Sequence, residues 1–173
     1  FILVSGCSTS GVDASDGSQG ESSQSPGINP VEEFYAGAFV KELIPEGNPE
    51  WYKEVCLGVF GILGIRNFGK LMSARADGVN DPPYVRVMVI SLGSKKLAFV
   101  VLDSAVMGNR VVNDILEGVS AKTDIPQWQI YVAVTHSHSS PDLLGYMGGV
   151  SSEYRKFLID ASVNAVVNAH ENM

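Results

Sequence analysis

The residues of this sequence best suited to hydrolytic chemistry are two histidines, which stand two positions apart in Thr135-His136-Ser137-His138-Ser139-Ser140-Pro141. If an extended strand continued through His136 and His138, both imidazoles would project from one face. That spacing suits two ligands of one metal ion, or one ligand beside an acid–base group. A neutral imidazole nitrogen binds Zn2+ well, and zinc brings the pKa of a bound water to about 7. The alternative is a pair of ordinary surface or core histidines, and the Ser- and Pro-rich surroundings favour a site.

A strand–helix–strand unit positions this pair. Leu97–Leu102 is nearly all apolar, as a strand buried on both faces would be. The stretch from Met107 to Thr123 has apolar residues at helical spacing, and Gln129–Thr135 is a second strand. This order implies a right-handed crossover with parallel pairing.

Further elements complete the expected fold. Phe34–Leu43 and Tyr84–Leu92 are predicted strands, and Gly93-Ser94-Lys95 is a hairpin-type turn. Ser151–Ala169 is predicted to be a helix with Ser151 or Ser152 as its cap and a buried stripe of Tyr154, Phe157, Leu158, Ala161 and Ala165. The fold class is therefore α/β, a mixed sheet with a βαβ crossover and flanking helices.

Carboxylates lie near the predicted ends of the parallel strands. Asp103 and His136 follow strands that end on one sheet edge, where ligands collect in open α/β sheets, so both could share one site. Asp103 could be a metal ligand, a partner that orients a histidine, or a helix cap, and we favour the last two roles. Asp142 adds a carboxylate close to the histidines. The turn with Arg75, Asp77 and Asp81 could line a cleft, but we favour an internally paired surface loop.

Composition narrows the class of protein. The chain has 173 residues, of which 45% are hydrophobic and 18% charged, as is ordinary for a folded domain. The net charge of -7 provides no basic face for nucleic acid, so we expect no nucleic-acid partner. Of the two cysteines, Cys56 is expected to be a buried apolar residue, and a disulfide with Cys7 is not expected.

The N-terminal region resembles a bacterial lipoprotein signal. The apolar run Phe1-Ile2-Leu3-Val4 leads into Ser5-Gly6-Cys7, which is similar to a lipobox. This resemblance implies cleavage before Cys7, lipidation of its thiol, export, and anchoring to the cell envelope. Residues 1–7 are thus a signal remnant, residues 8–30 a flexible Ser- and Gly-rich tether, and residues 31–173 the folded part. Because the chain starts without Met and stops inside a helical pattern, we expect a fragment of a longer protein.

Four segments, in the same order as in the family, resemble the neutral/alkaline (non-lysosomal) ceramidases. The histidine segment is similar to their THTHSGP sequence. The turn over residues 74–82, the strand that ends at Asp103 and the C-terminal helix with Val167, Asn168 and His170 are similar as well. Ser140 stands where the family usually has Gly, and a side chain there would narrow the cleft or change the angle of the loop.

This resemblance implies an activity. The family consists of zinc amidases that cleave the N-acyl bond of ceramide. It implies that His136 is the ligand of one zinc ion and that His138 contacts the substrate or the developing oxyanion. From its position at the strand end, we expect Asp103 to support the site. The remaining ligands, another His, a Glu and a Tyr, would lie outside this chain, so the piece alone should be inactive. The alternatives are a related hydrolase acting on another envelope amide or ester, and a surface lipoprotein that only binds ligands.

Overall fold

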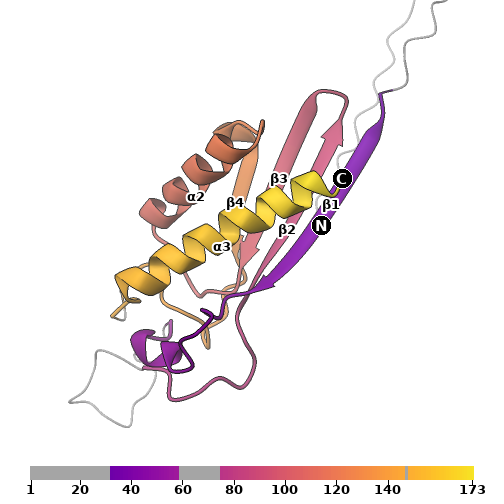
Figure 1. Ribbon diagram of the computed structural model, residues 1–173. Coiled ribbons are helices and arrows are strands. Elements are labelled where there is room, and N and C mark those ends of the chain that lie inside the picture. The colour runs from indigo at the N-terminus through magenta and orange to yellow at the C-terminus, as the bar shows by residue number, and fades with distance from the viewer. Residues whose placement is uncertain (1–31, 59–74, 147) are drawn as a thin grey trace, which may run out of the picture. The chain divides into compact units, whose positions relative to one another are not determined.

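Four strands form one mixed sheet in the order β1-β2-β3-β4 in the computed structural model (Figure 1). The structure describes residues 32–58, 75–146 and 148–173. The strands are β1 Phe34–Glu42, β2 Tyr84–Leu92, β3 Lys95–Leu102 and β4 Ile130–Val134. The predictions for the signal remnant 1–7 with Cys7, and for the tether 8–30, lie outside the described residues.

The β2–β3 hairpin follows from its turn residues. Leu92 pairs with Lys95, which leaves Gly93 and Ser94 as a two-residue turn. Gly93 has φ +56, a left-handed conformation that glycine adopts without steric cost. Turns of this kind match the twist of paired strands, so the sequence placed this hairpin correctly.

The predicted crossover is confirmed. Helix α2, Asn109–Lys122, connects β3 to β4, and these two strands pair in parallel from Ala98–Ile130 to Leu102–Val134. Val111, Ile115 and Val119 form the buried stripe of α2, at the spacing of one helical face. The carboxyl ends of β3 and β4 therefore meet at one edge of the sheet.

Helix α3, Ser152–Glu171, begins at the predicted cap. The Ser151 hydroxyl accepts a hydrogen bond from the Tyr154 backbone N–H at 3.0 Å. Tyr154, Leu158 and Ala165 are buried as expected, whereas Phe157 and Ala161 are only half-buried. Short 3-10 helices, η1 Trp51–Glu54 and η2 Gln127–Gln129, complete the described elements.

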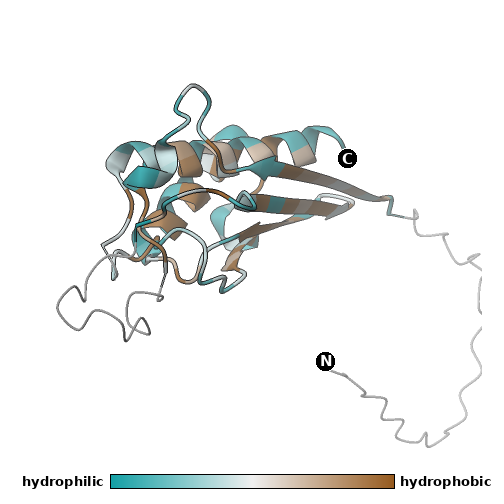
Figure 2. Cartoon of the chain, turned by 90° about the horizontal axis from the view of Figure 1, so that it is seen from below, coloured by the Kyte–Doolittle hydropathy of each residue, from teal (hydrophilic) through white to brown (hydrophobic). Residues whose placement is uncertain are grey.

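Both long helices cover the same face of the sheet, as Figures 1 and 2 show. On that face Val85, Val87 and Val89 of β2 are buried, together with Ala98, Val100 and Leu102 of β3. The alternate residues of β3 are only half-buried, so the expectation that this strand is buried on both faces is wrong. Within the described ranges, neither long helix covers the second face, where Met88 is 45% and Tyr131 55% exposed.

Gly37 permits close contact between β1 and α3. A Cβ atom built on Gly37 would lie 1.9 Å from the backbone oxygen of Ala169. Because backbone cannot yield as a side chain can, Gly37→Ala is expected to lower the free energy of unfolding by about 1–3 kcal/mol. Urea denaturation measures this. The control Gly78→Ala, where nothing lies within 4 Å, should change stability by less than about 0.5 kcal/mol. Equal effects of the two substitutions would contradict the proposed contact.

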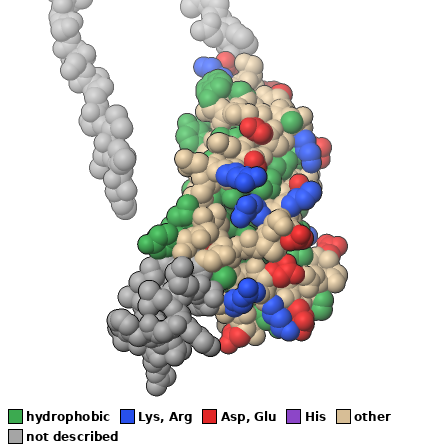
Figure 3. All heavy atoms as spheres, turned by 90° about the vertical axis from the view of Figure 1, so that its left-hand side faces the viewer, with side chains coloured by type: hydrophobic (Ala, Val, Ile, Leu, Met, Phe, Trp, Pro, Cys, Tyr) green, Lys and Arg blue, Asp and Glu red, His purple; other side chains and the backbone are tan. Residues whose placement is uncertain are grey.

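The surface in Figure 3 carries intermixed basic and acidic side chains, without a continuous basic patch on that face. In the part of the chain that the structure describes, no helix has the length and apolar character needed to cross a membrane. Cys56 is buried, as expected, and burial raises the pKa of its thiol.

Candidate functional site

The backbone turns sharply at His136. Strand β4 ends at Val134, and the Thr135 N–H still donates to the Leu102 carbonyl at 3.0 Å. His136 then adopts φ +62, and it is the one non-glycine residue with positive φ among those described. The extended path considered for the two histidines is therefore not present, because a left-handed residue follows directly after the predicted strand. Strain of this kind often marks a functional site.

The two imidazoles nevertheless converge. The Nε2 atoms of His136 and His138 lie 3.3 Å apart, and the rings stand at 82° to each other. The Nδ1 atom of His136 lies 2.6 Å from the carbonyl oxygen of Ala105. Because a carbonyl can only accept a hydrogen bond, Nδ1 of His136 carries the hydrogen. In the neutral ring Nε2 is then the atom with the lone pair, and it faces His138.

The distance between the two Nε2 atoms is compatible with two nitrogen ligands of one zinc ion. Two nitrogens bound to one tetrahedral zinc lie about 3.3 to 3.4 Å apart when the Zn–N bonds are about 2.0–2.1 Å long. Metal-binding histidines almost always donate their second ring N–H to a carboxylate, a carbonyl or water, as His136 does to Ala105. Over residues 32–58, 75–146 and 148–173 no group of three His, Cys, Asp or Glu side chains is close enough to hold a metal. Further ligands would have to come from elsewhere.

Asp103 does not contact the histidines through any hydrogen bond found in the described part of the chain. Its carboxylate accepts hydrogen bonds from Arg86 Nη1, at 2.9 Å to each oxygen, and from the Tyr84 backbone N–H, also at 2.9 Å. Gly108 is the N-cap of α2, so the capping role that we favoured for Asp103 is wrong. The orienting contact to His136 that we expected from a carboxylate comes from the backbone of Ala105.

Asp142 organises the loop after the histidine segment. Its carboxylate is 1% exposed and accepts hydrogen bonds from the backbone N–H groups of Leu144, Gly145 and Gly149 at 3.0–3.2 Å. Its own N–H donates to the Cys56 carbonyl at 2.8 Å. The carboxylate therefore stabilises the conformation of this loop.

Two cavities border the histidine segment. One, of about 300 Å3, has a largely aromatic and aliphatic wall that includes Trp51, Tyr52 and Leu57. The other, of about 350 Å3, is lined by Arg86, Asp103 and the serines at 137, 139 and 140. Ser139 lines both cavities, so an apolar and a polar compartment meet at the histidine segment, with its serines and Pro141 rather than the imidazoles in their walls. No periodic pattern around Trp51 and Tyr52 indicated that these residues belong to this site.

The turn over residues 75–83 forms part of this wall. Asp77 and Asp81 line the apolar cavity, and Asp81 also lines the polar one. Arg75 instead donates to the Lys53 carbonyl at 2.7 Å. Arg75, Asp77 and Asp81 are all exposed, and Asn80 donates to Asp81 at 3.0 Å within the turn, so the favoured interpretation as a surface loop is confirmed. The two aspartates form part of a cavity wall as well. The turn becomes a wall because its neighbours in space are residues 51–57, far from it in sequence.

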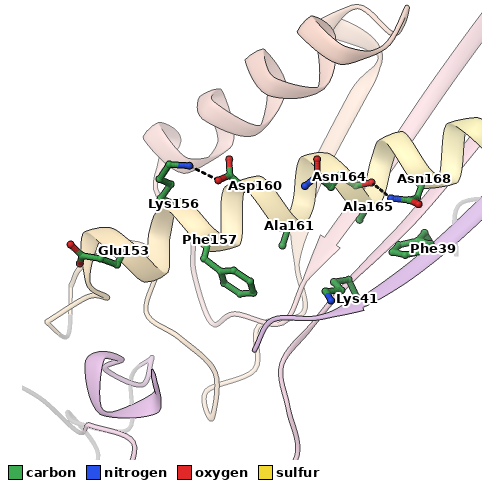
Figure 4. A pocket seen from close by; sticks show the side chains of 10 residues that line it. All are labelled: Phe39, Lys41, Glu153, Lys156, Phe157, Asp160, Ala161, Asn164, Ala165 and Asn168. Atoms are coloured by element: carbon green, nitrogen blue, oxygen red, sulfur yellow. Dashed lines mark hydrogen bonds and ion pairs between the residues drawn. The ribbon is translucent and has the colours of Figure 1, made fainter. Parts of the chain in front are cut away.

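A larger groove lies away from the histidines, between α3 and the edge strand β1 (Figure 4). Its volume is about 610 Å3, and Phe39, Phe157 and Ala161 line its floor. Lys156 and Asp160 form an ion pair at its rim. No residue of the histidine segment 135–141 lines this groove, so it is separate from the candidate hydrolytic site. It explains why Phe157 and Ala161 are only half-buried.

The third histidine belongs to a separate cluster. His170 Nε2 lies 2.9 Å from Asp124 Oδ1 and 3.0 Å from Lys96 Nζ, while Lys96 also contacts Asp124 at 2.6 Å. The hydrogen bond from Lys96 lowers the pKa of the Asp124 carboxyl. This cluster ties the end of α3 to β3 and to the loop after α2.

The left-handed conformation of His136 leads to a stability prediction. A non-glycine residue in this conformation costs about 1–2 kcal/mol, and glycine removes that cost. His136→Gly should therefore lower the free energy of unfolding by about 1 kcal/mol less than the matched change His138→Gly, since His138 has no positive φ. Urea denaturation of both variants measures the difference. A larger loss at His136 would contradict strain at this residue.

Comparison with known proteins supports the fold. No protein-family model and no curated protein matches the chain. Among solved structures it is similar to neutral ceramidase from Pseudomonas aeruginosa, with a TM-score of 0.65 and 16% identity over 82% of this chain and 22% of that chain. It is also similar to a ceramidase complexed with C2, with a TM-score of 0.62 and 17% identity over the same shares. The chain thus spans about a fifth of the length of these structures. At such identities the likeness concerns the fold alone, and the predicted resemblance is confirmed at that level: the chain has the fold of part of a neutral ceramidase.

Proposed function

We propose that this chain carries part of the site of a zinc-dependent amide hydrolase. The observation that carries the proposal is the convergence of the His136 and His138 Nε2 atoms at 3.3 Å, with His136 Nδ1 fixed by the Ala105 carbonyl. The fold of part of a neutral ceramidase supports it. His136 would hold one zinc ion together with ligands from outside this chain.

Zinc held here by His136 would supply Lewis-acid chemistry for transfer of an acyl group to water. The chain's own residues do the rest. The Ala105 carbonyl keeps His136 in the tautomer that presents Nε2. His138 holds or moves a proton at Nε2, which lies within reach of the same point in space. Asp103 keeps Arg86 at the wall of the polar cavity, and we retain it as a supporting residue.

The two cavities suggest an amphiphilic substrate. The apolar cavity with Trp51 and Leu57 suits an alkyl chain, and the polar one with Arg86, Asp103 and serines suits a hydrogen-bonding head group. We propose an N-acyl lipid of the ceramide type. The polar lining equally favours a second candidate, a related hydrolase acting on another envelope amide or ester. Hydrolysis rates on a panel of ceramides, other N-acyl lipids and esters would separate the two.

The test is metal content and turnover of histidine variants in the longest form of the protein that carries this sequence. His136→Ala should lose most of its zinc by mass spectrometry of metals. His138→Ala should keep zinc and lose about 100-fold or more in kcat. The matched control is His170→Ala, which removes the histidine of the Lys96–Asp124 cluster and should keep both properties.

Stoichiometric zinc in His136→Ala would remove its role as a ligand. Loss of zinc in His138→Ala would make that residue a second ligand instead of an acid–base group. The 173-residue chain alone should show no turnover, because described residues supply at most two donors. Measured turnover by this piece would refute the proposal that ligands lie outside it.

We also propose that the protein is exported and anchored to the bacterial cell envelope by a lipid on Cys7. The apolar run before Cys7 and the Ser- and Gly-rich segment after it support this. Cys7→Ser should move the protein from the membrane fraction to the soluble fraction. Equal membrane recovery of both forms would argue against the anchor.

A further inference from the structure

The orientation of His136 depends on a carbonyl group whose own position has to be fixed. Ala105 is fully buried, and its oxygen lies 2.6 Å from His136 Nδ1. Ala105 lies in the connection between β3 and α2, where a carbonyl can turn with its peptide plane unless neighbouring groups hold it. The contacts around Ala105 therefore decide which nitrogen of His136 carries the hydrogen.

Ser104 supplies those contacts. Its side chain is fully buried, and its Oγ lies 2.8 Å from the Val106 carbonyl oxygen and 2.8 Å from the Pro141 carbonyl oxygen. The first contact spans Ala105 and so restrains the peptide planes on either side of it. The second joins this segment to the end of the histidine segment. One hydroxyl, whose single hydrogen is shared between two acceptors, thus connects the residue after Ala105 with the end of the histidine segment.

Packing on Ala105 leaves it little freedom to move. A Cβ atom built on Gly58 would lie 2.3 Å from the Ala105 Cβ, so these two residues are in close contact. The Gly58 N–H donates to the Ser140 carbonyl at 3.0 Å, which holds the same loop from the other side. The close approach of Gly58 and the full burial of Ala105 therefore restrict the movement of this residue.

We propose that Ser104 is a positioning residue, which acts through the Ala105 carbonyl to keep His136 in its Nδ1–H tautomer with Nε2 presented to His138. The purpose of this tautomer rests on the proposed function, but the tautomer itself does not. Positioning groups of this kind typically change metal affinity by about 10- to 100-fold when they are removed. Ser104 is thus expected to raise the affinity for zinc without contacting the ion.

The test measures the tautomer directly. Long-range proton–nitrogen NMR spectra of the 15N-labelled 173-residue chain, recorded at pH 8.5 where free imidazole is neutral, report which ring nitrogen carries the hydrogen. In the unaltered chain His136 should be in the Nδ1–H form. In Ser104→Ala the ratio of the Nδ1–H to the Nε2–H form should fall by about fivefold, the effect expected from weakening one hydrogen bond.

The chain offers a matched control. Ser162 is also fully buried, and its hydroxyl donates to the Leu158 carbonyl at 2.7 Å within α3. Ser162→Ala removes the same group from another part of the core and should leave the tautomer ratio of His136 unchanged. Ser104→Cys, which keeps a weak donor of similar size, should restore part of the ratio. If Ser104→Ala does not fold, Ser104→Cys is compared with Ser162→Ala in its place.

Zinc affinity of the longer protein distinguishes this proposal from the proposed function. A changed tautomer ratio with at least about tenfold weaker zinc binding in Ser104→Ala supports both. A changed ratio in a protein that binds no zinc supports the positioning role and overturns the zinc function. An unchanged ratio in Ser104→Ala, or an equal change in Ser162→Ala, overturns the positioning role whatever the zinc result.

Discussion

Tyr154→Ala is expected to lower the free energy of unfolding by about 3–5 kcal/mol, the cost of removing a large buried aromatic side chain. Tyr154 is 2% exposed and stacks on Trp51 with ring centroids 5.2 Å apart and planes within 6°. Its hydroxyl donates to the Leu43 carbonyl at 3.1 Å, so it joins α3 to the end of β1. Burial also raises the pKa of Tyr154, which should keep it neutral at pH 10.

Urea denaturation followed by circular dichroism measures this change. Tyr154→Phe separates the ring from the hydroxyl, and it should cost only about 1 kcal/mol because packing on Trp51 remains. Equal losses in both variants would show that the hydroxyl, rather than the ring, provides the stability. Trp51 also lines the apolar cavity. Tyr154→Ala, which removes the ring stacked on Trp51, is therefore expected to loosen that wall of the cavity as well.

Asp142→Ala is expected to lower the free energy of unfolding by about 3 kcal/mol, since it leaves three backbone donors, of which that of Gly149 is buried, without their acceptor. The N–H groups of Leu144, Gly145 and Gly149 would lose the carboxylate that they share. Asp142→Asn should cost roughly half as much, because one amide oxygen still accepts. Hydrogen exchange at Leu144 and Gly145 should accelerate together with the loss of stability.

The control for this prediction is Asp160→Ala. Asp160 is exposed and paired with Lys156 on α3, and surface pairs of this kind contribute about 0–1 kcal/mol. An Asp142→Ala variant that unfolds at the same urea concentration as Asp160→Ala would contradict the structural role of the buried carboxylate. That result would favour a role for Asp142 in the candidate site instead.

Local sequence patterns were sufficient for the framework of the fold. Alternation of apolar residues located β2, helical spacing located α2, and Gly93-Ser94 located the hairpin. These patterns depend on neighbours in the sequence, where periodicity is informative. The half-exposed second face of β3 could not be predicted in this way, because it depends on which elements cover it.

The candidate site was predictable in its residues and less so in its geometry. The spacing of His136 and His138 indicated a pair, but a left-handed residue brings the rings together instead of a continuous strand. The group that orients His136 is a backbone carbonyl, and every residue has one, so no residue type could reveal it. Asp103 looked like a partner for a histidine, yet Arg86 on the adjacent strand occupies it. Such pairing across strands depends on the register between β2 and β3, which cannot be read from the sequence alone.

The edge strand β1 has a consequence for handling the protein. Its pairing with β2 extends over nine residues without a bulge, and the Glu33 carbonyl and the Leu43 N–H both contact that side. By the alternation of a strand, the N–H and C=O groups of Ala36, Ala38 and Val40 are directed to the open edge. A long, apolar, regular edge is a template for strand addition between molecules. Since β1 is the edge of the sheet among the described residues, we expect concentrated solutions of this chain to associate through β1, and Ala38→Pro to reduce that association.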